Sequence, residues 1–233
     1  RGETVWTADD VEEVDDWRIA KAPLDLPAGT YTLHVRADGS TAVVDAAGEE
    51  LPAAAAEGAA FSAFVAAGQS CVAGSRFLVQ RGIYDEFVAA LTARARAIRV
   101  GDPALPDTQM GPLISARQRD KVTALIQTGV DEGATLAAGG QIPTLPSPFD
   151  GGFYLEPTVL SDATMDMTVA REEIFGPVAV VIPFDSEHDG VQMANDNPYG
   201  LGAGVWTTDV SRAHRVAARI NAGMVWVNTW LLG

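Results

Sequence analysis

The chain has one cysteine, Cys71, and the residues around it suit a nucleophilic thiol. Gly68 and Gly74 flank the cysteine and would let a substrate approach the sulfur closely. Such a thiol also needs a nearby dipole or cation that favours the thiolate. A lone cysteine is more often a small buried apolar residue, so the wider pattern has to decide between the two interpretations.

Two segments supply that pattern. The run Gly68-Gln-Ser-Cys-Val-Ala-Gly-Ser-Arg76 resembles the active-site segment of the NAD(P)-dependent aldehyde dehydrogenase superfamily, in which the cysteine is the nucleophile. The run Arg171-Glu-Glu-Ile-Phe-Gly-Pro-Val178 resembles the segment that holds the nicotinamide ribose and ring in that family. The resemblance implies that Glu173 and Phe175 bind NAD or NADP. Two such segments about a hundred residues apart are a specific signal.

Further runs match the same family in order, at 100–103, 110–114, 152–158, 197–201 and 223–228. The resemblance implies an aldehyde dehydrogenase-like catalytic domain over residues 45–233, preceded by an atypical acidic segment over residues 1–44. It also places Asn228 near the family's substrate tunnel, although a plain strand-ending role explains this asparagine equally well.

Some parts of the family's machinery are not found in the sequence. The general base of the family is a glutamate before the cysteine. Counting back by the family's spacing gives Ala37, and aligning the strand register gives His34, so neither position holds a carboxylate. Asp38 and Asp45 are nearby carboxylates, but a turn accounts for Asp38. The dinucleotide-binding domain, with its phosphate cradle and second oxyanion donor, is also not found. The resemblance implies that a partner chain or an unseen segment supplies these groups.

The composition excludes several classes of function. With 16 basic and 31 acidic residues, the chain has a net charge of −15 and lacks the basic clusters that bind nucleic acid. The sequence contains no run of 18 or more apolar residues that would span a membrane. The three histidines have no metal-ligand spacing, so no metal site is expected, and a single cysteine cannot form an internal disulfide. A cytoplasmic location fits this composition.

Helix and strand patterns alternate after residue 50, which is typical of an α/β fold. Apolar spacing predicts a helix over 83–98, a capping box from Ser115 to Gln118 opens another, and Asp209 caps a third. We expect an open, twisted, mostly parallel sheet flanked by helices, with the apolar run Val178–Ile182 buried on both faces. The predicted strands are 76–80, 153–160, 178–184, 203–207 and 224–228.

The N-terminal segment follows a different pattern. Val11, Val14 and Trp17 have a three-residue spacing that predicts a short acidic helix over residues 7–17. Residues 31–35 and 41–44 flank an Asp-Gly pair and predict a β-hairpin.

Three functions agree with these features. The favoured one is oxidation of an aldehyde to an acid through a Cys71 thiohemiacetal and thioester, with hydride transfer to NAD(P). The second is a non-catalytic subunit that serves the assembly or regulation of a full-length aldehyde dehydrogenase, and the third is a thiol-dependent esterase or acyl carrier. An uncovered apolar face predicts a homo-oligomer or hetero-oligomer, formed through the strand near Met224–Asn228. The sequence names neither the aldehyde nor the choice between NAD and NADP.

Overall fold

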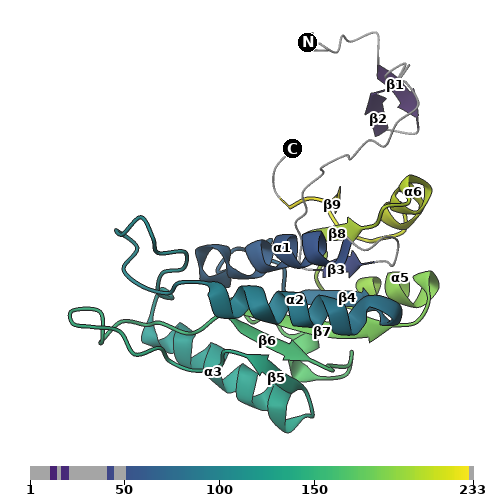
Figure 1. Ribbon diagram of the computed structural model, residues 1–233. Helices are drawn as coiled ribbons and strands as arrows, with labels where there is room; N and C mark the ends of the chain where they lie inside the picture. Colours follow the sequence, from purple (N-terminus) through teal and green to yellow (C-terminus); the bar gives the residue numbers. More distant parts are fainter. Residues whose placement is uncertain (1–10, 15–16, 21–40, 45–50, 231–233) are drawn as a thin grey trace. The chain divides into compact units, whose positions relative to one another are not determined.

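The computed structural model describes residues 11–14, 17–20, 41–44 and 51–230 (Figure 1). The chain divides into two compact units, residues 1–33 and residues 34–233, which are described separately. The predicted division at residues 44 and 45 falls inside the second unit.

In the first unit, the structure describes an antiparallel pair of strands, β1 (Val11–Val14) and β2 (Trp17–Ala20). Val14 lies opposite Trp17 across this pair. The predicted acidic helix over residues 7–17 is therefore wrong for the described part of that range. Valine and tryptophan favour strands, and here that preference prevails over the three-residue spacing.

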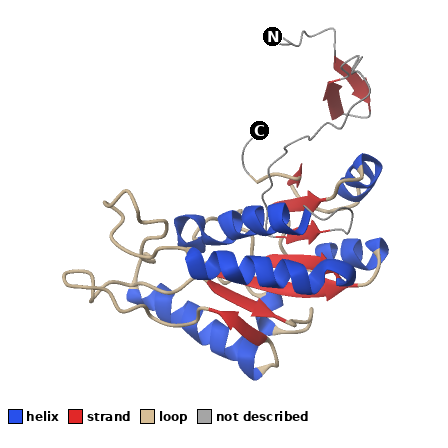
Figure 2. Ribbon diagram, in the orientation of Figure 1, coloured by secondary structure: helices blue, strands red, loops and turns tan. Residues whose placement is uncertain are grey.

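Within its described residues, the second unit has a seven-stranded sheet in the order β5-β6-β7-β4-β3-β8-β9 (Figure 2). Six of these seven strands run parallel, and β5 runs antiparallel to β6. The predicted open, mostly parallel sheet is confirmed. The strands are β3 (Thr41–Val44), β4 (Arg76–Gln80), β5 (Thr135–Ala138), β6 (Thr158–Ser161), β7 (Val178–Phe184), β8 (Gly202–Trp206) and β9 (Met224–Val227).

Strand β3 lies in the middle of this sheet. It pairs in parallel with β4 on one side and with β8 on the other. The predicted hairpin is therefore wrong for residues 41–44, because both edges of this strand are already occupied. The other predicted arm, residues 31–35, lies outside the described residues.

Helices cover both faces of the sheet, and Figure 1 shows α1 and α2 side by side across one of them. Phe77 and Val79 of β4 pack in a core with these two helices, whereas Leu78 packs on the opposite face with α3, α5 and α6. A central strand buried on both faces is the arrangement predicted for a parallel sheet. Among the described residues, no helix is long and apolar enough to cross a membrane. The helices are α1 (Leu51–Phe64), α2 (Tyr84–Ala97), α3 (Ala116–Asp131), α4 (Thr168–Arg171), α5 (Glu187–Asn195) and α6 (Val210–Ala217), with short 3₁₀ helices η2 (Val65–Gly68) and η3 (Arg81–Ile83).

Most predicted elements are present, with altered ends. The helix predicted over residues 83–98 is α2, and Asp209 caps α6 by accepting hydrogen bonds from the backbone N–H groups of Ser211 and Arg212. The strand predicted from residue 153 begins only at Thr158, directly after Pro157. Proline lacks the N–H that a central strand would use, so the ladder starts after it.

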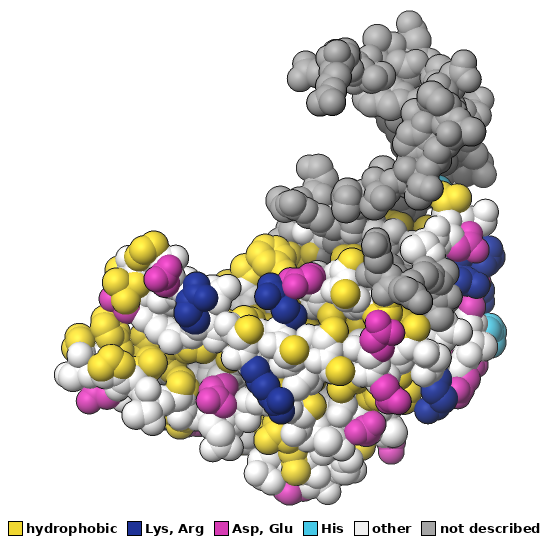
Figure 3. Space-filling view, in the orientation of Figure 1, with side chains coloured by type: hydrophobic (Ala, Val, Ile, Leu, Met, Phe, Trp, Pro, Cys, Tyr) yellow, Lys and Arg dark blue, Asp and Glu magenta, His cyan; other side chains and the backbone are white. Residues whose placement is uncertain are grey.

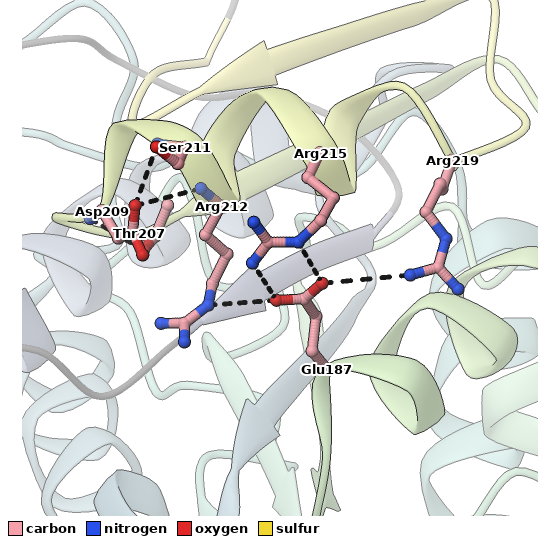
Figure 4. A network of polar contacts seen from close by, with 7 residues as sticks. All are labelled: Glu187, Thr207, Asp209, Ser211, Arg212, Arg215 and Arg219. Carbon is pink, nitrogen blue, oxygen red and sulfur yellow. Dashed lines mark hydrogen bonds and ion pairs between the residues drawn. The ribbon is translucent and has the colours of Figure 1, made fainter.

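An ionic network joins α5 to α6 (Figure 4). The Glu187 carboxylate accepts hydrogen bonds from Arg215 at 2.6 and 2.8 Å and from Nε of Arg212 at 3.2 Å. A guanidinium nitrogen of Arg219 lies 3.9 Å from the same carboxylate. Hydrogen bonds and charge from Arg215, and then from Arg212, lower the pKa of Glu187 from 4.5 to about 2, against the opposing effect of burial.

We expect this network to make stability depend on pH. Because the folded-state pKa of Glu187 is depressed, its stabilisation is full above the ordinary value of 4.5 and is lost as the pH falls towards about 2. Glu187→Gln should lower the unfolding temperature by about 3–6 °C near neutral pH. Calorimetry at a series of pH values should show this difference shrinking below about pH 4.5.

The matched control is Glu57→Gln, because Glu57 pairs with a single half-exposed residue, Arg94. An exposed pair of this kind stabilises by about 0–1 kcal/mol. A Glu187→Gln effect no larger than that of Glu57→Gln, or one that stayed constant down to about pH 3, would contradict the account.

Candidate active site

Cys71 lies in a loop between η2 and the start of β4, and its side chain is exposed. The chain enters this loop through three consecutive residues with positive φ, Ala66 at 51°, Ala67 at 54° and Gly68 at 67°. A Cβ atom on Gly68 would overlap the carbonyl oxygen of Gly176. Glycine is therefore required at position 68 both for its backbone angle and for its close approach to a second loop.

Contacts from three directions hold this cysteine loop in place. The indole N–H of Trp230 donates a buried hydrogen bond of 3.0 Å to the carbonyl of Val72. The Gln69 side chain accepts one of 3.0 Å from the Ile114 backbone N–H. The Ser75 carbonyl accepts one of 2.8 Å from the N–H of Val180 in β7. The thiol is thus exposed on a backbone that is fixed by distant parts of the chain.

The second predicted segment forms the loop between α4 and β7. Phe175 is half-buried there, with a positive φ of 56° that is strained for a bulky side chain. The Gln118 side chain donates hydrogen bonds of 2.8 Å to the Phe175 carbonyl and 3.2 Å to the Ile174 carbonyl. These bonds from α3 fix the loop in its strained conformation.

The same contacts correct one sequence-based prediction. Ser115 caps α3 by accepting a hydrogen bond from the Gln118 backbone N–H, as expected. The Gln118 side chain does not return to Ser115, so the predicted capping box is only half formed. The amide instead holds the loop that carries Phe175, a contact between residues 57 positions apart.

The two predicted segments meet in one pocket of about 210 Å³. Cys71, Glu173 and Phe175 all line it, so the structure brings together the three residues that the sequence singled out. The remaining lining residues are Gly68, Ser70, Ala73, Gly74, Ser75, Arg76, Ala170, Arg171, Glu172, Ile174, Gly176, Asn197, Tyr199, Gly200 and Leu201.

The pocket lies at the amino ends of parallel strands. Ser75, Gly176 and Leu201 line it, and they lie just before β4, β7 and β8 respectively. Ligands of open α/β sheets usually bind beyond the carboxyl ends of the strands. The general rule for this class of fold would therefore have predicted a site at the carboxyl ends of the strands, whereas the two sequence segments meet at the amino ends.

Two arginines that line the pocket, Arg76 and Arg171, both interact with the carboxylate of Asp196. Arg76 is only 6% exposed, and its guanidinium donates a hydrogen bond of 3.4 Å to the Ala194 carbonyl. Burial lowers the pKa of Arg76, Asp196 opposes that effect, and Arg171 adds to it. Arg171 itself forms a 3.1 Å ion pair with Asp196.

Asn228 lies outside this pocket. Its side-chain oxygen accepts a hydrogen bond of 2.8 Å from the Thr207 N–H, and its side-chain nitrogen donates one of 2.8 Å to the Thr207 carbonyl. The amide thus joins the ends of β8 and β9, which is the strand-ending role that the sequence left open.

Other residues of interest are not part of the described site. His34, Asp38 and Asp45, considered above as bases, lie outside the described residues. In the part of the chain that the structure describes, no group of three or more His, Cys, Asp or Glu residues could hold a metal ion. Sequence reasoning missed Tyr199 and Trp230, whose contacts reach loops far away in the sequence.

Comparison with known proteins gives a consistent result. The sequence profile described as "Aldehyde dehydrogenase family" matches residues 31–233. A betaine aldehyde dehydrogenase of Mesorhizobium japonicum is 50% identical over 175 residues, which is 75% of this chain and 36% of the relative. A 2-hydroxymuconic semialdehyde dehydrogenase of Pseudomonas putida is 47% identical over 176 residues, which is 76% of this chain and 36% of the relative.

Solved structures agree with these relatives. HpcC from Thermus thermophilus superposes with a TM-score of 0.79 at 40% identity, over 84% of this chain and 38% of that structure. An NAD⁺ complex of aldehyde dehydrogenase from Bacillus cereus superposes with a TM-score of 0.77 at 40% identity, over 84% of this chain and 39% of that structure. The chain therefore spans little more than a third of the length of the relatives it matches.

Proposed function

Because this chain belongs to the aldehyde dehydrogenase family, we propose that it carries the nucleophile and part of the nicotinamide site of an enzyme that oxidises an aldehyde to an acid. The observation that carries the proposal is the single pocket that contains Cys71, Glu173 and Phe175. The two curated relatives are named for different aldehydes, so the proposal extends to the class of aldehydes and not to one substrate.

Cys71 begins the proposed reaction. Its thiolate sulfur adds to the aldehyde carbon, and the carbonyl electron pair moves to the oxygen to give a thiohemiacetal oxyanion. Among the described residues, none accepts a backbone hydrogen bond from the Cys71 N–H, which supports a role for this N–H as an oxyanion donor. The oxyanion then re-forms the carbonyl while the carbon releases hydride, which leaves a thioester on Cys71. Water adds to the thioester carbon as a general base takes its proton, the carbon–sulfur bond then breaks, and the acid leaves with the thiolate restored.

Two residues of the pocket suit the nicotinamide end of NAD(P). The Glu173 side chain is exposed in the pocket, and a carboxylate accepts hydrogen bonds from the two hydroxyls of a ribose. Phe175 offers an apolar ring beside it, on a loop that Gln118 fixes. A bound nicotinamide would accept the hydride. The phosphates and adenosine need further groups, because the sequence contains no phosphate cradle.

The general base, the second oxyanion donor and the phosphate cradle are proposed to come from a partner chain or from further sequence. Figure 3 shows hydrophobic side chains gathered on the loops that project from the sheet. Leu105 is 57% exposed, Ile142 54% and Ile114 80%. The backbone N–H of Ile114 bonds to Gln69 in the cysteine loop, so this exposed isoleucine lies next to that loop. Apolar exposure of this kind supports a covering partner.

A second candidate is a non-catalytic subunit that assembles with a full-length aldehyde dehydrogenase. The sequence favours it at one point, because no carboxylate stands at the position of the family's general-base glutamate, where the strand register puts His34. The two candidates differ in whether Cys71 reacts within the assembled protein.

Reaction with an activated ester tests the nucleophile without any cofactor. 4-Nitrophenyl acetate should acylate the protein once, with the acetyl group on the peptide that contains Cys71, as intact-protein and peptide mass spectrometry would show. Acylation only at lysines or serines would contradict the assignment of Cys71.

A further inference from the structure

We propose that Tyr199 is a positioning residue that sets the place of Glu173 in the pocket and thereby sets the affinity for the nicotinamide nucleotide. The inference rests on the proposed function for the role of Glu173. Its structural part concerns only how the backbone of Glu173 is held.

Glu173 is held on both sides of its backbone. Its N–H donates a hydrogen bond of 3.2 Å to the hydroxyl oxygen of Tyr199, and its carbonyl accepts one of 2.8 Å from the ammonium of Lys121. Lys121 belongs to α3, before Glu173 in the sequence, and Tyr199 belongs to the loop after α5, which follows Glu173. No partner of the Glu173 carboxylate is found among the described residues. The backbone is therefore fixed while the carboxylate stays available to a ligand.

Tyr199 is itself placed by local bonds. Its N–H donates a hydrogen bond of 2.9 Å to the Asn197 side-chain oxygen, and the Asn197 side-chain nitrogen donates one of 2.8 Å to the Ala194 carbonyl at the end of α5. The carbonyl of Gly200 accepts one of 2.8 Å from the Gly223 N–H. The loop that carries Tyr199 is thus attached to α5 and to the residue before β9.

A second link joins the same two loops. Arg171, two residues before Glu173, pairs at 3.1 Å with Asp196, three residues before Tyr199. The ion pair holds the start of the Glu173 loop, but it makes no contact with Glu173 itself. The tyrosine hydroxyl is the group of this loop that reaches the Glu173 backbone, so it carries the positioning role.

The test compares Tyr199→Phe with wild type by calorimetric titration with NAD⁺ and NADP⁺. The change removes one oxygen and keeps the ring, so the nucleotide Kd should rise about fivefold, as expected for the loss of one hydrogen bond. Hydrogen exchange of the Glu173 amide should also become faster, because that N–H loses its acceptor.

Tyr84→Phe is the matched control. The Tyr84 hydroxyl bonds to the Val181 carbonyl at 3.2 Å and to the Asp162 N–H at 2.7 Å, and this residue is not among those that line the pocket. This variant should lower the unfolding temperature and leave the nucleotide Kd unchanged. Tyr199→Phe should instead raise the nucleotide Kd and leave the unfolding temperature nearly unchanged, because Tyr199 is 48% exposed.

The outcomes distinguish a failure of the positioning role of Tyr199 from a failure of the proposed nucleotide site. An unchanged nucleotide Kd in Tyr199→Phe, with wild type binding normally, would overturn the positioning role. A rise in Kd equal to that of Tyr84→Phe would also overturn it, because the effect would then be one of general stability. If the wild-type protein, purified together with any partner chain it retains, binds neither nucleotide, the proposed cofactor site fails. Exchange of the Glu173 amide then decides whether Tyr199 holds this residue.

Discussion

Cys71→Ser is expected to lower both the reaction with activated esters and any aldehyde-dependent NAD(P)H formation by at least about 10³-fold. Serine keeps the size and shape of the side chain, but its hydroxyl does not ionise near neutral pH. The loop itself should be unaffected, because the bonds from Trp230, Ile114 and Val180 go to residues other than Cys71. Stopped-flow absorbance with 4-nitrophenyl acetate measures the loss directly.

Two control measurements show whether Cys71→Ser leaves the rest of the protein intact. The unfolding temperature of Cys71→Ser should match wild type, and its NAD(P)⁺ affinity should persist because Glu173 and Phe175 lie in another loop. A Cys71→Ser protein that still reacted at a tenth of the wild-type rate or faster would contradict the nucleophile assignment.

Gly68→Ala is expected to destabilise the protein by about 2–4 kcal/mol and to disrupt the pocket. Gly68 has a φ of 67°, and an added Cβ would overlap the backbone carbonyl of Gly176. Backbone atoms cannot turn aside as the end of a side chain can. The cysteine loop would have to separate from the loop that carries Phe175, so the rate of Cys71 acylation should fall along with the unfolding temperature.

Gly82→Ala is the matched control for this change. Gly82 is exposed, and a Cβ there would meet no atom within 4 Å. Its stability should stay within about 0.5 kcal/mol of wild type. If denaturant unfolding showed equal stability for Gly68→Ala and Gly82→Ala, the two loops would not be in the close contact described here.

Local patterns predicted the elements well because their causes lie within a few residues. The periodicity of α2 and the cap at Asp209 depend on neighbours three or four positions away. Prediction failed where a distant contact decided the outcome. Gln118 has the right spacing for a capping box, yet its side chain bonds to loop carbonyls 56 and 57 positions away. Residues 41–44 resemble a hairpin arm, yet β4 and β8 take both edges of that strand.

The residues of the candidate site also fall into those that the sequence predicted and those that it did not. Cys71, Glu173 and Phe175 were found from the resemblance of two segments, and the structure places all three in one pocket. The groups that hold these residues were not found. Trp230 and Val72 are 158 positions apart, and Tyr199 and Glu173 are 26 apart. Nothing in the local sequence marks a tyrosine or a tryptophan as the partner of a particular backbone group, because only the folded chain brings them together.

The most direct test of the account is NAD(P)H formation with a panel of aldehydes, measured on the protein purified together with any partner chain it retains. We predict aldehyde-dependent NAD(P)H and an equal amount of acid, both absent in Cys71→Ser. No NAD(P)H from a protein whose Cys71 reacts readily with 4-nitrophenyl acetate would contradict the dehydrogenase function and favour a thiol esterase. No reaction of either kind would favour the non-catalytic subunit.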